Sequence, residues 1–409
     1  MYSLKHKWSF ITAIIPFALS FFFLTQVYTC KEDIKPVGVT YDQFAGSDKC
    51  VQCHKEIYDQ HIQSAHYLTA KPVEPKWMKG SFEPGKNEYW YSPLIEVKME
   101  HRDSGWYQVA YYKGEEKKAM RMDFVVGSAA KGQSFMTWRR NKLFQLPITY
   151  YTVADRWSNS PGYPPSKVVI DKPITSRCLE CHNTYAEALN GKSLEPTEFN
   201  REKMILGVDC ERCHGPSARH VEFQTKHPEE KTSKYTINPT SFTRQQKLDM
   251  CALCHGGNIT KTKPSFEFVA GNNLADYFKI NSLNEMAVNN GNIDVHGNQI
   301  GLLQASKCFK LSEMTCNTCH DAHKNERGQT AALSLRCITC HPTDKENFKT
   351  PAHIGLTSIE KNCIDCHMPA LPSRAITVQV QGEEIPRSSK VRSHFISIYP
   401  DETKKFIGK

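Results

Sequence analysis

Residues 210–220 read CERCHGPSARH, in which two cysteines separated by two residues are followed at once by a histidine, and a second histidine ends the stretch. In a C-x-x-C-H pentapeptide the two thiols can form thioethers with the vinyl groups of one haem, and the adjoining imidazole can bind its iron. The pentapeptide therefore indicates a covalently attached haem c, held by Cys210, Cys213 and His214.

This pentapeptide occurs seven times along the chain. Cysteine and histidine each make up about 4% of the residues, so chance would supply only on the order of a few hundredths of one match. The sequence therefore predicts seven covalent haem c groups. The attaching cysteines and the first iron ligand of each motif, from the first to the seventh, are Cys50, Cys53 and His54; Cys178, Cys181 and His182; Cys210, Cys213 and His214; Cys251, Cys254 and His255; Cys316, Cys319 and His320; Cys337, Cys340 and His341; and Cys363, Cys366 and His367.

Two other uses of cysteine fit this pattern less well. Zinc ribbons also contain C-x-x-C, but they pair two such knuckles on one metal and need no histidine directly after the second cysteine. A disulfide scaffold would account for 16 cysteines in an exported chain. It would leave seven histidines in one register unexplained, whereas haem attachment accounts for both features.

The first 29 residues carry the features of an export signal. Lys5 and Lys7 precede an apolar run from Phe10 to about Leu24, which is shorter than the roughly 20 residues that span a bilayer. Export also agrees with the motifs, because haem c is attached outside the cytoplasm. We therefore expect residues 1–29 to be a signal peptide and the mature protein to lie in the periplasm or at the cell surface.

The signal ends at Cys30, within the letters VYTC, and charged residues follow at once. This stretch resembles a relaxed bacterial lipobox, in which cleavage exposes the cysteine for lipid attachment, so we expect a membrane anchor at Cys30. Two alternatives stay open. One is an ordinary signal peptide cleaved nearby, and the other is a disulfide between Cys30 and Cys308, which are the two cysteines outside the haem motifs.

The formal net charge of +9 does not predict nucleic-acid binding. Removal of residues 1–29 takes away two lysines and no acidic residue. The propionates of seven haems more than offset the remaining charge, and the single positive charge on each ferric porphyrin core brings the oxidised holoprotein back to roughly neutral. Binding to a polyanion needs a standing positive surface. We therefore expect redox proteins, and no nucleic acid, as partners.

Haem has to supply much of the core, because only 39% of the residues are hydrophobic. We expect a mainly α fold with little regular secondary structure around a haem-packed core. The segments YWYSPLIEVKME, WYQVAYYK and KAMRMDFVV predict a small antiparallel β-meander in the N-terminal third. The expected organisation is a signal peptide at 1–29, a tether at 30–48, a first-haem segment with the meander at 49–157, a three-haem module at 158–270, and a three-haem module with a C-terminal tail at 271–409.

The second axial ligands must come from histidines outside the motifs. A haem iron has two axial positions on opposite faces, so its two ligands face each other across the ring. His320 and His323 are three residues apart, and on a helix such side chains point the same way, so they cannot bind one iron. If His323 is a ligand, it binds a neighbouring haem. The same argument applies less tightly to His214 and His220.

Five blocks of the chain resemble the cytochrome c-554 family of multihaem cytochromes. They are GSDKCVQCHKEIYDQHIQSAH at 46–66, GVDCERCHGPSARHV at 207–221, SKCFKLSEMTCNTCHDAHK at 306–324, CIDCHMP at 363–369 and RSHF at 392–395. The resemblance implies that the second axial ligands include His66, His220 and His323, that His353 and His394 occupy ligand positions of larger relatives, and that His296 is a further candidate.

Three histidines and one ligand position stand apart from this assignment. His61 lies where relatives often carry a tryptophan, so we expect it either to pack or to compete with His66. His101 and His227 lie in a strand-like segment and a polar loop, where we expect solvated side chains. Six second ligands can be named in this way, and the seventh stays unassigned.

These features predict an exported, membrane-anchored heptahaem cytochrome that transfers electrons between a membrane-side donor and a periplasmic or surface acceptor. Mostly bis-histidine haems should have low reduction potentials. The alternative is a multihaem oxidoreductase, in which one haem with an open axial position acts on nitrite, hydroxylamine or a sulfur oxyanion. The unassigned seventh ligand keeps this alternative open, although we expect an electron carrier rather than an enzyme.

The anchor is tested by Cys30→Ser. We expect this variant to move from the membrane fraction to the soluble fraction with its haem content unchanged, because only the site of lipid attachment is lost. Fractionation and the absorbance of haem in each fraction measure the result. A wild-type protein that is already soluble would contradict the anchor.

Overall fold

The computed structural model describes residues 38–190, 193–257, 259–280, 293–345, 348 and 359–407. The signal peptide, Cys30 and His353 lie outside these residues. Within them, strands account for about as many residues as helices, so the expectation of a mainly α fold is wrong. No helix in this part of the chain is both long and apolar enough to cross a membrane.

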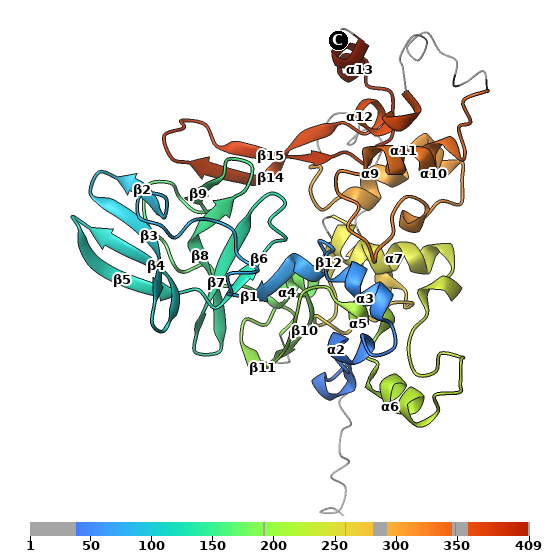
Figure 1. Cartoon of the computed structure of the whole chain (residues 1–409), viewed down its shortest axis with the longest axis horizontal. Coiled ribbons are helices and arrows are strands. Elements are labelled where there is room, and N and C mark those ends of the chain that lie inside the picture. The colour runs from blue at the N-terminus through green and yellow to red at the C-terminus, as the bar shows by residue number, and fades with distance from the viewer. Residues whose placement is uncertain are drawn as a thin grey trace, which may run out of the picture. The chain divides into compact units, whose positions relative to one another are not determined.

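An antiparallel sheet of seven strands is the largest regular element (Figure 1). Its central strand β8 reads KLFQLPITYY and is buried at nearly every position. A strand buried on both faces lacks the alternation of apolar and polar residues that marks a strand with one exposed face, so the sequence pattern did not predict β8. The strands follow the order β1 (Ala70–Pro72), β6 (Phe124–Val126), β7 (Gln133–Arg139), β8 (Lys142–Tyr151), β9 (Arg156–Asn159), β14 (Ala370–Val380) and β15 (Arg387–Arg392).

A second sheet is an antiparallel meander of four strands, so the small meander expected from the sequence is only one part of a larger β structure. The two sheets share a hydrophobic core that includes Met99, Phe135 and Trp157. The buried amide of Gln108 joins them, because it donates to the carbonyl of Ile148 at 2.7 Å and accepts from its N–H at 3.0 Å. The meander strands are β2 (Glu88–Ser92), β3 (Ile95–Arg102), β4 (Gly105–Tyr112) and β5 (Glu115–Arg121).

The last two strands of the large sheet come from the C-terminal part of the chain. In β14, Gln379 and Val380 pair with Asn159 and Ser158 of β9. The other end of the β14–β15 hairpin reaches the seventh motif, where Arg392 donates to the carbonyl of Met368 at 3.0 Å. The hairpin therefore connects the sheet to a haem motif.

The rest of the chain consists of short helices, small hairpins and loops. The capping box at Thr243 and Gln246 begins the longest of the motif helices, α7, which ends at the histidine of the fourth motif. The motif helices are α2 (Ser47–Cys50), α4 (Ser176–His182), α5 (Cys210–His214), α7 (Arg244–His255), η5 (Cys316–Thr318), α11 (Thr330–Ile338) and α12 (Cys363–His367). The other elements are η1 (Tyr41–Gln43), α3 (Lys55–His61), η2 (Tyr67–Thr69), α6 (Ala218–Lys226), η3 (Pro239–Ser241), η4 (Leu274–Asp276), α9 (Gln299–Ala305), α10 (Lys307–Lys310), η6 (Ile359–Lys361) and α13 (Pro400–Ile407), with the hairpins β10 (Asn183–Ala188) to β11 (Phe199–Leu206) and β12 (Ile259–Lys261) to β13 (Phe278–Ile280).

Buried carboxylates inside two motifs fasten these short helices to distant segments. Glu211, between the cysteines of the third motif, accepts hydrogen bonds from the N–H groups of Ala45 at 2.8 Å, Gly46 at 2.9 Å and Ser217 at 2.8 Å. Glu180, in the second motif, accepts from the N–H of Phe266 at 2.9 Å. The loops before the first motif and before α6 are therefore held by a residue of the third motif.

Replacing Glu211 by alanine should destabilise the protein, because three N–H groups lose a charged acceptor. We expect a loss of about 3 to 5 kcal/mol in the free energy of unfolding, seen as a lower midpoint of thermal unfolding of the holoprotein. The matched control is Glu222→Ala, since Glu222 lies exposed on α6 and pairs only with Lys226 there. Equal midpoints for the two variants would contradict the role of Glu211.

Candidate haem-binding site

All seven motifs line one cavity of about 3430 Å³. Every attaching cysteine and every motif histidine predicted from the sequence borders it, from Cys50 in α2 to His367 in α12. The cavity is also lined by five of the six proposed second ligands, and the sixth, His353, lies outside the described residues. The residues present therefore fit a group of haems that share one interior.

Three pairs of histidine rings have the spacing of two ligands on one iron. Each ligand nitrogen lies roughly 2 Å from the metal, so the centres of two trans imidazoles are roughly 6 Å apart. In each pair one ring belongs to a motif and the other does not. The ring centroids of His66 and His255 are 6.2 Å apart, those of His214 and His323 are 6.1 Å apart, and those of His320 and His394 are 6.2 Å apart.

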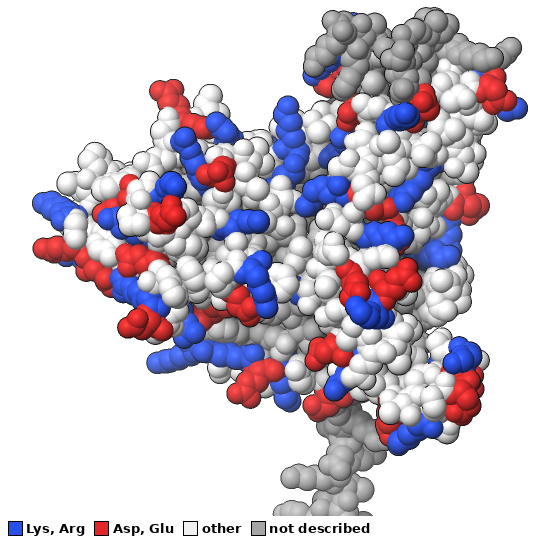
Figure 2. Space-filling view, viewed as in Figure 1, with Lys and Arg blue, Asp and Glu red and all other residues white. Residues whose placement is uncertain are grey.

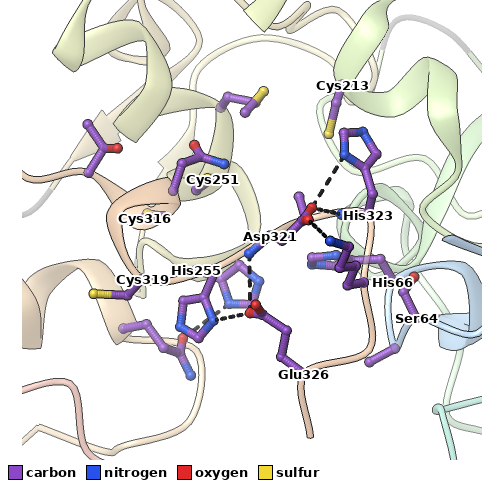
Figure 3. A pocket seen from close by; sticks show the side chains of 18 of the residues that line it. Ser64, His66, Cys213, Cys251, His255, Cys316, Cys319, Asp321, His323 and Glu326 are labelled. Carbon is purple, nitrogen blue, oxygen red and sulfur yellow. Dashed lines mark hydrogen bonds and ion pairs between the residues drawn. The ribbon is translucent and has the colours of Figure 1, made fainter. Parts of the chain in front are cut away.

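The segment 320–323 thus contributes rings to two different pairs. His323, which borders the pocket drawn in Figure 3, lies against His214 of the third motif. His320 lies against His394. This arrangement follows the geometric argument that His320 and His323 cannot share an iron. Ligation by these side chains stays a prediction.

Several motif histidines and candidate second ligands have hydrogen-bond acceptors at Nδ1, whereas Nδ1 of His182 is buried without one in the described part of the chain. The Nδ1 atoms of His214, His220 and His367 lie 2.9, 2.8 and 2.9 Å from the carbonyl oxygens of Ile237, Lys234 and Ser397. An imidazole that donates from Nδ1 presents an unprotonated Nε2 to a metal. These contacts therefore prepare the rings to bind iron.

Burial keeps the proposed ligands neutral, as metal binding requires. It lowers the pKa of His66 to about 4, with a further contribution from His255. It also lowers the pKa of His394 to about 4, with His320 adding to the effect. Both imidazoles are therefore unprotonated at neutral pH and would protonate only in acid.

His296 and His220 belong to none of the three ring pairs, but each lies near a motif histidine. Burial lowers the pKa of His182, and neighbouring His296 adds to it, which places His296 beside the second motif. Burial likewise lowers the pKa of His214, with additions from His323, His54 and His220. His220 therefore lies near the third motif.

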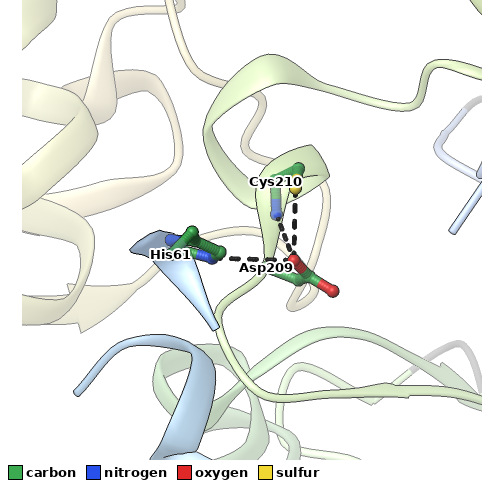
Figure 4. Close-up of side chains that lie close together, drawn as sticks. All are labelled: His61, Asp209 and Cys210. Atoms are coloured by element: carbon green, nitrogen blue, oxygen red, sulfur yellow. Dashed lines mark hydrogen bonds and ion pairs between the residues drawn. The ribbon is translucent and has the colours of Figure 1, made fainter. Parts of the chain in front are cut away.

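His61 is buried, at 7% exposure, and lies close enough to His66 to help lower the pKa of that imidazole. Its Nε2 lies 3.6 Å from Oδ1 of Asp209, which also lies 3.3 Å from Sγ of Cys210 (Figure 4). Its ring packs edge-on against those of Tyr67 and His323. The three side chains are spaced for a metal ion, but Cys210 is a predicted haem-attaching residue.

His101 and His227 lie away from the cavity. His101 stacks on Trp106 in the meander, with ring centroids 4.1 Å apart, and the half-exposed His227 lies near Glu229. Cys308 borders the cavity, but its suggested disulfide partner, Cys30, lies outside the described residues. These positions agree with solvated side chains at His101 and His227.

Sequence reasoning missed the polar residues that support the ligands. Glu326 and Gln299 accept from the Nδ1 atoms of His320 and His255, each at 3.2 Å. Nothing in the spacing of the motifs points to them. The acidic residues inside the motifs CLEC and CERC were a visible signal for Glu180 and Glu211, because a charged residue there must find a partner.

The fold and parts of the sequence are similar to those of known haem proteins. Residues 158–215 match the family model of cytochrome c554 and c-prime. The C-type polyheme cytochrome OmcC of Geobacter sulfurreducens is 24% identical over 227 residues, which cover 52% of this chain and 22% of OmcC. This chain thus matches about a fifth of the length of that relative.

A solved structure agrees with the fold over nearly the whole chain. The crystal structure of the outer cell wall cytochrome OcwA matches with a TM-score of 0.54 and 16% sequence identity, covering 90% of this chain and 82% of OcwA. At this identity the match concerns the fold alone. Together with the seven C-x-x-C-H motifs around one cavity, these similarities identify the chain as a multihaem c-type cytochrome with covalently bound haem c.

Proposed function

We propose that this cytochrome is an exported carrier of seven haems that transfers electrons between a membrane-side donor and a periplasmic or surface acceptor. The observation that carries the proposal is the single cavity bordered by all seven motifs. Haem c supplies one-electron redox chemistry when bound. The chain supplies attachment, axial ligands and the spacing between neighbouring sites.

Thiols from different motifs lie next to one another and support a continuous path. Each pair is close enough for its two thiols to interact through a hydrogen bond, so the attachment points of two haems are neighbours. The first motif thereby adjoins the third, the second and fifth both adjoin the fourth, and the sixth adjoins the seventh. The pairs are Cys50 with Cys210, Cys181 with Cys254, Cys251 with Cys316, and Cys337 with Cys363.

Two electrostatic interactions between cysteines connect the motifs that these thiol pairs leave unconnected. Cys213 of the third motif adds to the raised pKa of Cys251, which is due mainly to its interaction with Cys316. Cys319 of the fifth motif likewise adds to the raised pKa of Cys337, where Cys363 is the main cause. The third motif is therefore near the fourth, and the fifth is near the sixth. All seven motifs belong to one connected series.

The paired rings favour electron transfer over substrate binding at three sites. If His66, His323 and His394 bind the irons opposite His255, His214 and His320, both axial positions of those haems are occupied by imidazole. Bis-histidine ligation gives low-spin haems of low potential, with no open position for a small molecule. The second ligands in the proposal are His66, His220, His296, His323, His353 and His394.

Location and partners follow from the sequence and from the fold relative. The apolar N-terminal segment and Cys30 support export with a lipid anchor, and the solved structure that shares the fold is described as an outer cell wall cytochrome. Acidic and basic side chains are interspersed on the face shown in Figure 2. Docking of a redox protein to this face would therefore depend on local charge pairs.

A second candidate function is reduction or oxidation of nitrite, hydroxylamine or a sulfur oxyanion at a haem with one open axial position. Only six histidines are proposed as second ligands for the seven motifs. The haem without a named second ligand is the site at which an enzymatic function is favoured. Catalysis would also require groups that supply protons to the bound substrate.

A spectroscopic and kinetic experiment separates the two functions. We expect mass spectrometry of the denatured protein to show seven haem increments, and the spectrum to be mostly low-spin. Reduction by a low-potential donor should be rapid, and nitrite, hydroxylamine or sulfite should change the spectrum little. A high-spin haem that turns over one of these substrates at about 1 to 10³ per second would establish the enzyme instead.

Removal of His323 should affect the haem of the third motif and leave the haem of its own motif intact, because its ring lies 6.1 Å from that of His214. We expect His323→Gly to produce one high-spin haem that added imidazole returns to low spin. A crystal structure should show the missing ligand at the haem held by Cys210 and Cys213. His227→Gly is the control and should keep the wild-type spectrum. A ligand lost at the haem of Cys316 and Cys319 would overturn the assignment.

A further inference from the structure

The proposed ligands of neighbouring haems have hydrogen-bond acceptors of different charge. His320 of the fifth motif has the carboxylate of Glu326 as its Nδ1 partner, at 3.2 Å. His255 of the fourth motif has the neutral amide oxygen of Gln299 at the same distance. On the other side of the fourth site, His66 interacts with the backbone of Ala322. The fifth site therefore has an anionic acceptor where the fourth has neutral ones.

Glu326 is held in place by contacts on both carboxylate oxygens. Oε2 accepts from the N–H of Asp321 at 3.2 Å (Figure 3) and also faces the ring of His320. Oε1 accepts from the guanidinium of Arg336. Arg336 also donates to the carbonyl of Cys319, within the same motif. The Glu326 side chain is only 12% exposed. Its position beside His320 is therefore fixed by Asp321, which follows the fifth motif, and by Arg336 of α11.

The carboxylate has partners that favour its charged form. Glu326 forms an ion pair with Arg336 and accepts the N–H of Asp321 at 3.2 Å. An ionised acceptor pulls the Nδ1 proton and gives the imidazole more electron density to donate to the iron. A donor of that kind, together with the nearby negative charge, favours the ferric state of a haem.

We propose that Glu326 lowers the reduction potential of the haem attached at Cys316 and Cys319, acting through His320 as a positioning residue. The inference rests on the proposed ligation of that haem by His320. Gln299 leaves the neighbouring haem of the fourth motif without such a bias. The different acceptors, Glu326 at the fifth motif and Gln299 at the fourth, thus give adjacent haems different reduction potentials.

Glu326→Gln tests this role, because it keeps the size of the side chain and removes its charge. Redox titration followed by haem absorbance should show one haem's share of the amplitude moving to higher potential. The principal g values of one low-spin haem should change in the electron paramagnetic resonance spectrum, since its ligand loses imidazolate character. Glu313→Gln is the control: Glu313 is 91% exposed and faces only Arg244, so the same loss of charge should leave the titration unchanged.

Two further variants keep the inference open to refutation if Glu326→Gln folds poorly. Gln299→Glu adds a carboxylate at the fourth site without removing a partner of Arg336, and it should move one haem to lower potential. Glu326→Asp keeps the charge but shortens the reach to Nδ1, and it should reproduce most of the shift of Glu326→Gln. Unchanged potentials in both Glu326→Gln and Gln299→Glu would overturn the inference.

The state of the haems shows which proposal has failed. Seven haem increments and a low-spin spectrum in variants with unchanged potentials would leave the carrier function standing and refute the role of Glu326. A wild-type protein without haem at Cys316 and Cys319, shown by mass analysis of proteolytic peptides, would instead refute the proposed haem arrangement, and with it the inference.

Discussion

The main constraint on this fold is that a haem iron binds its two axial ligands on opposite faces. Neighbours on one helix cannot meet that requirement, so each paired site draws on segments far apart in the sequence. His66 and His255, whose rings come together, are 189 positions apart in the sequence, and His214 and His323 are 109 positions apart. Short helices and long excursions follow from this need, because each motif only has to present one imidazole and two thiols.

Hydrogen bonds and ion pairs of a few buried side chains hold the short helices and loops around the haem motifs in place. Glu211 of the third motif accepts hydrogen bonds from N–H groups of two loops. Near the fifth motif, Glu326 accepts hydrogen bonds from Asp321 and Arg336. Buried carboxylates are tolerable only when such partners compensate for the loss of hydration. The same groups that fix the shape of a haem site therefore also place charge beside it, so structure and redox behaviour are linked through a few side chains.

The sequence predicted the local chemistry better than the architecture. The pentapeptide predicts which residues hold haem, and the structure brings all seven copies to one cavity. The spacing of His320 and His323 argues against a shared iron, and their rings lie against different histidines, although neither residue lies in a helix. The large sheet was missed because β8 is apolar on both faces, and because β14 and β15 join it from the far end of the chain. Glu326 and Gln299 carry no motif, since their role depends on which imidazole the fold brings to them.

The β14–β15 hairpin also bears on how the protein is made. Asn159 of β9 finds its partner, Gln379, only after 220 further positions have been synthesised, including six of the seven motifs. Until then β9 presents an open edge, which is a template for wrong pairing with other chains. Such a non-local contact is slow to form. A chain truncated before residue 370 would keep that edge exposed. Full-length molecules can complete the sheet late in folding, whereas such fragments would be prone to aggregation or degradation.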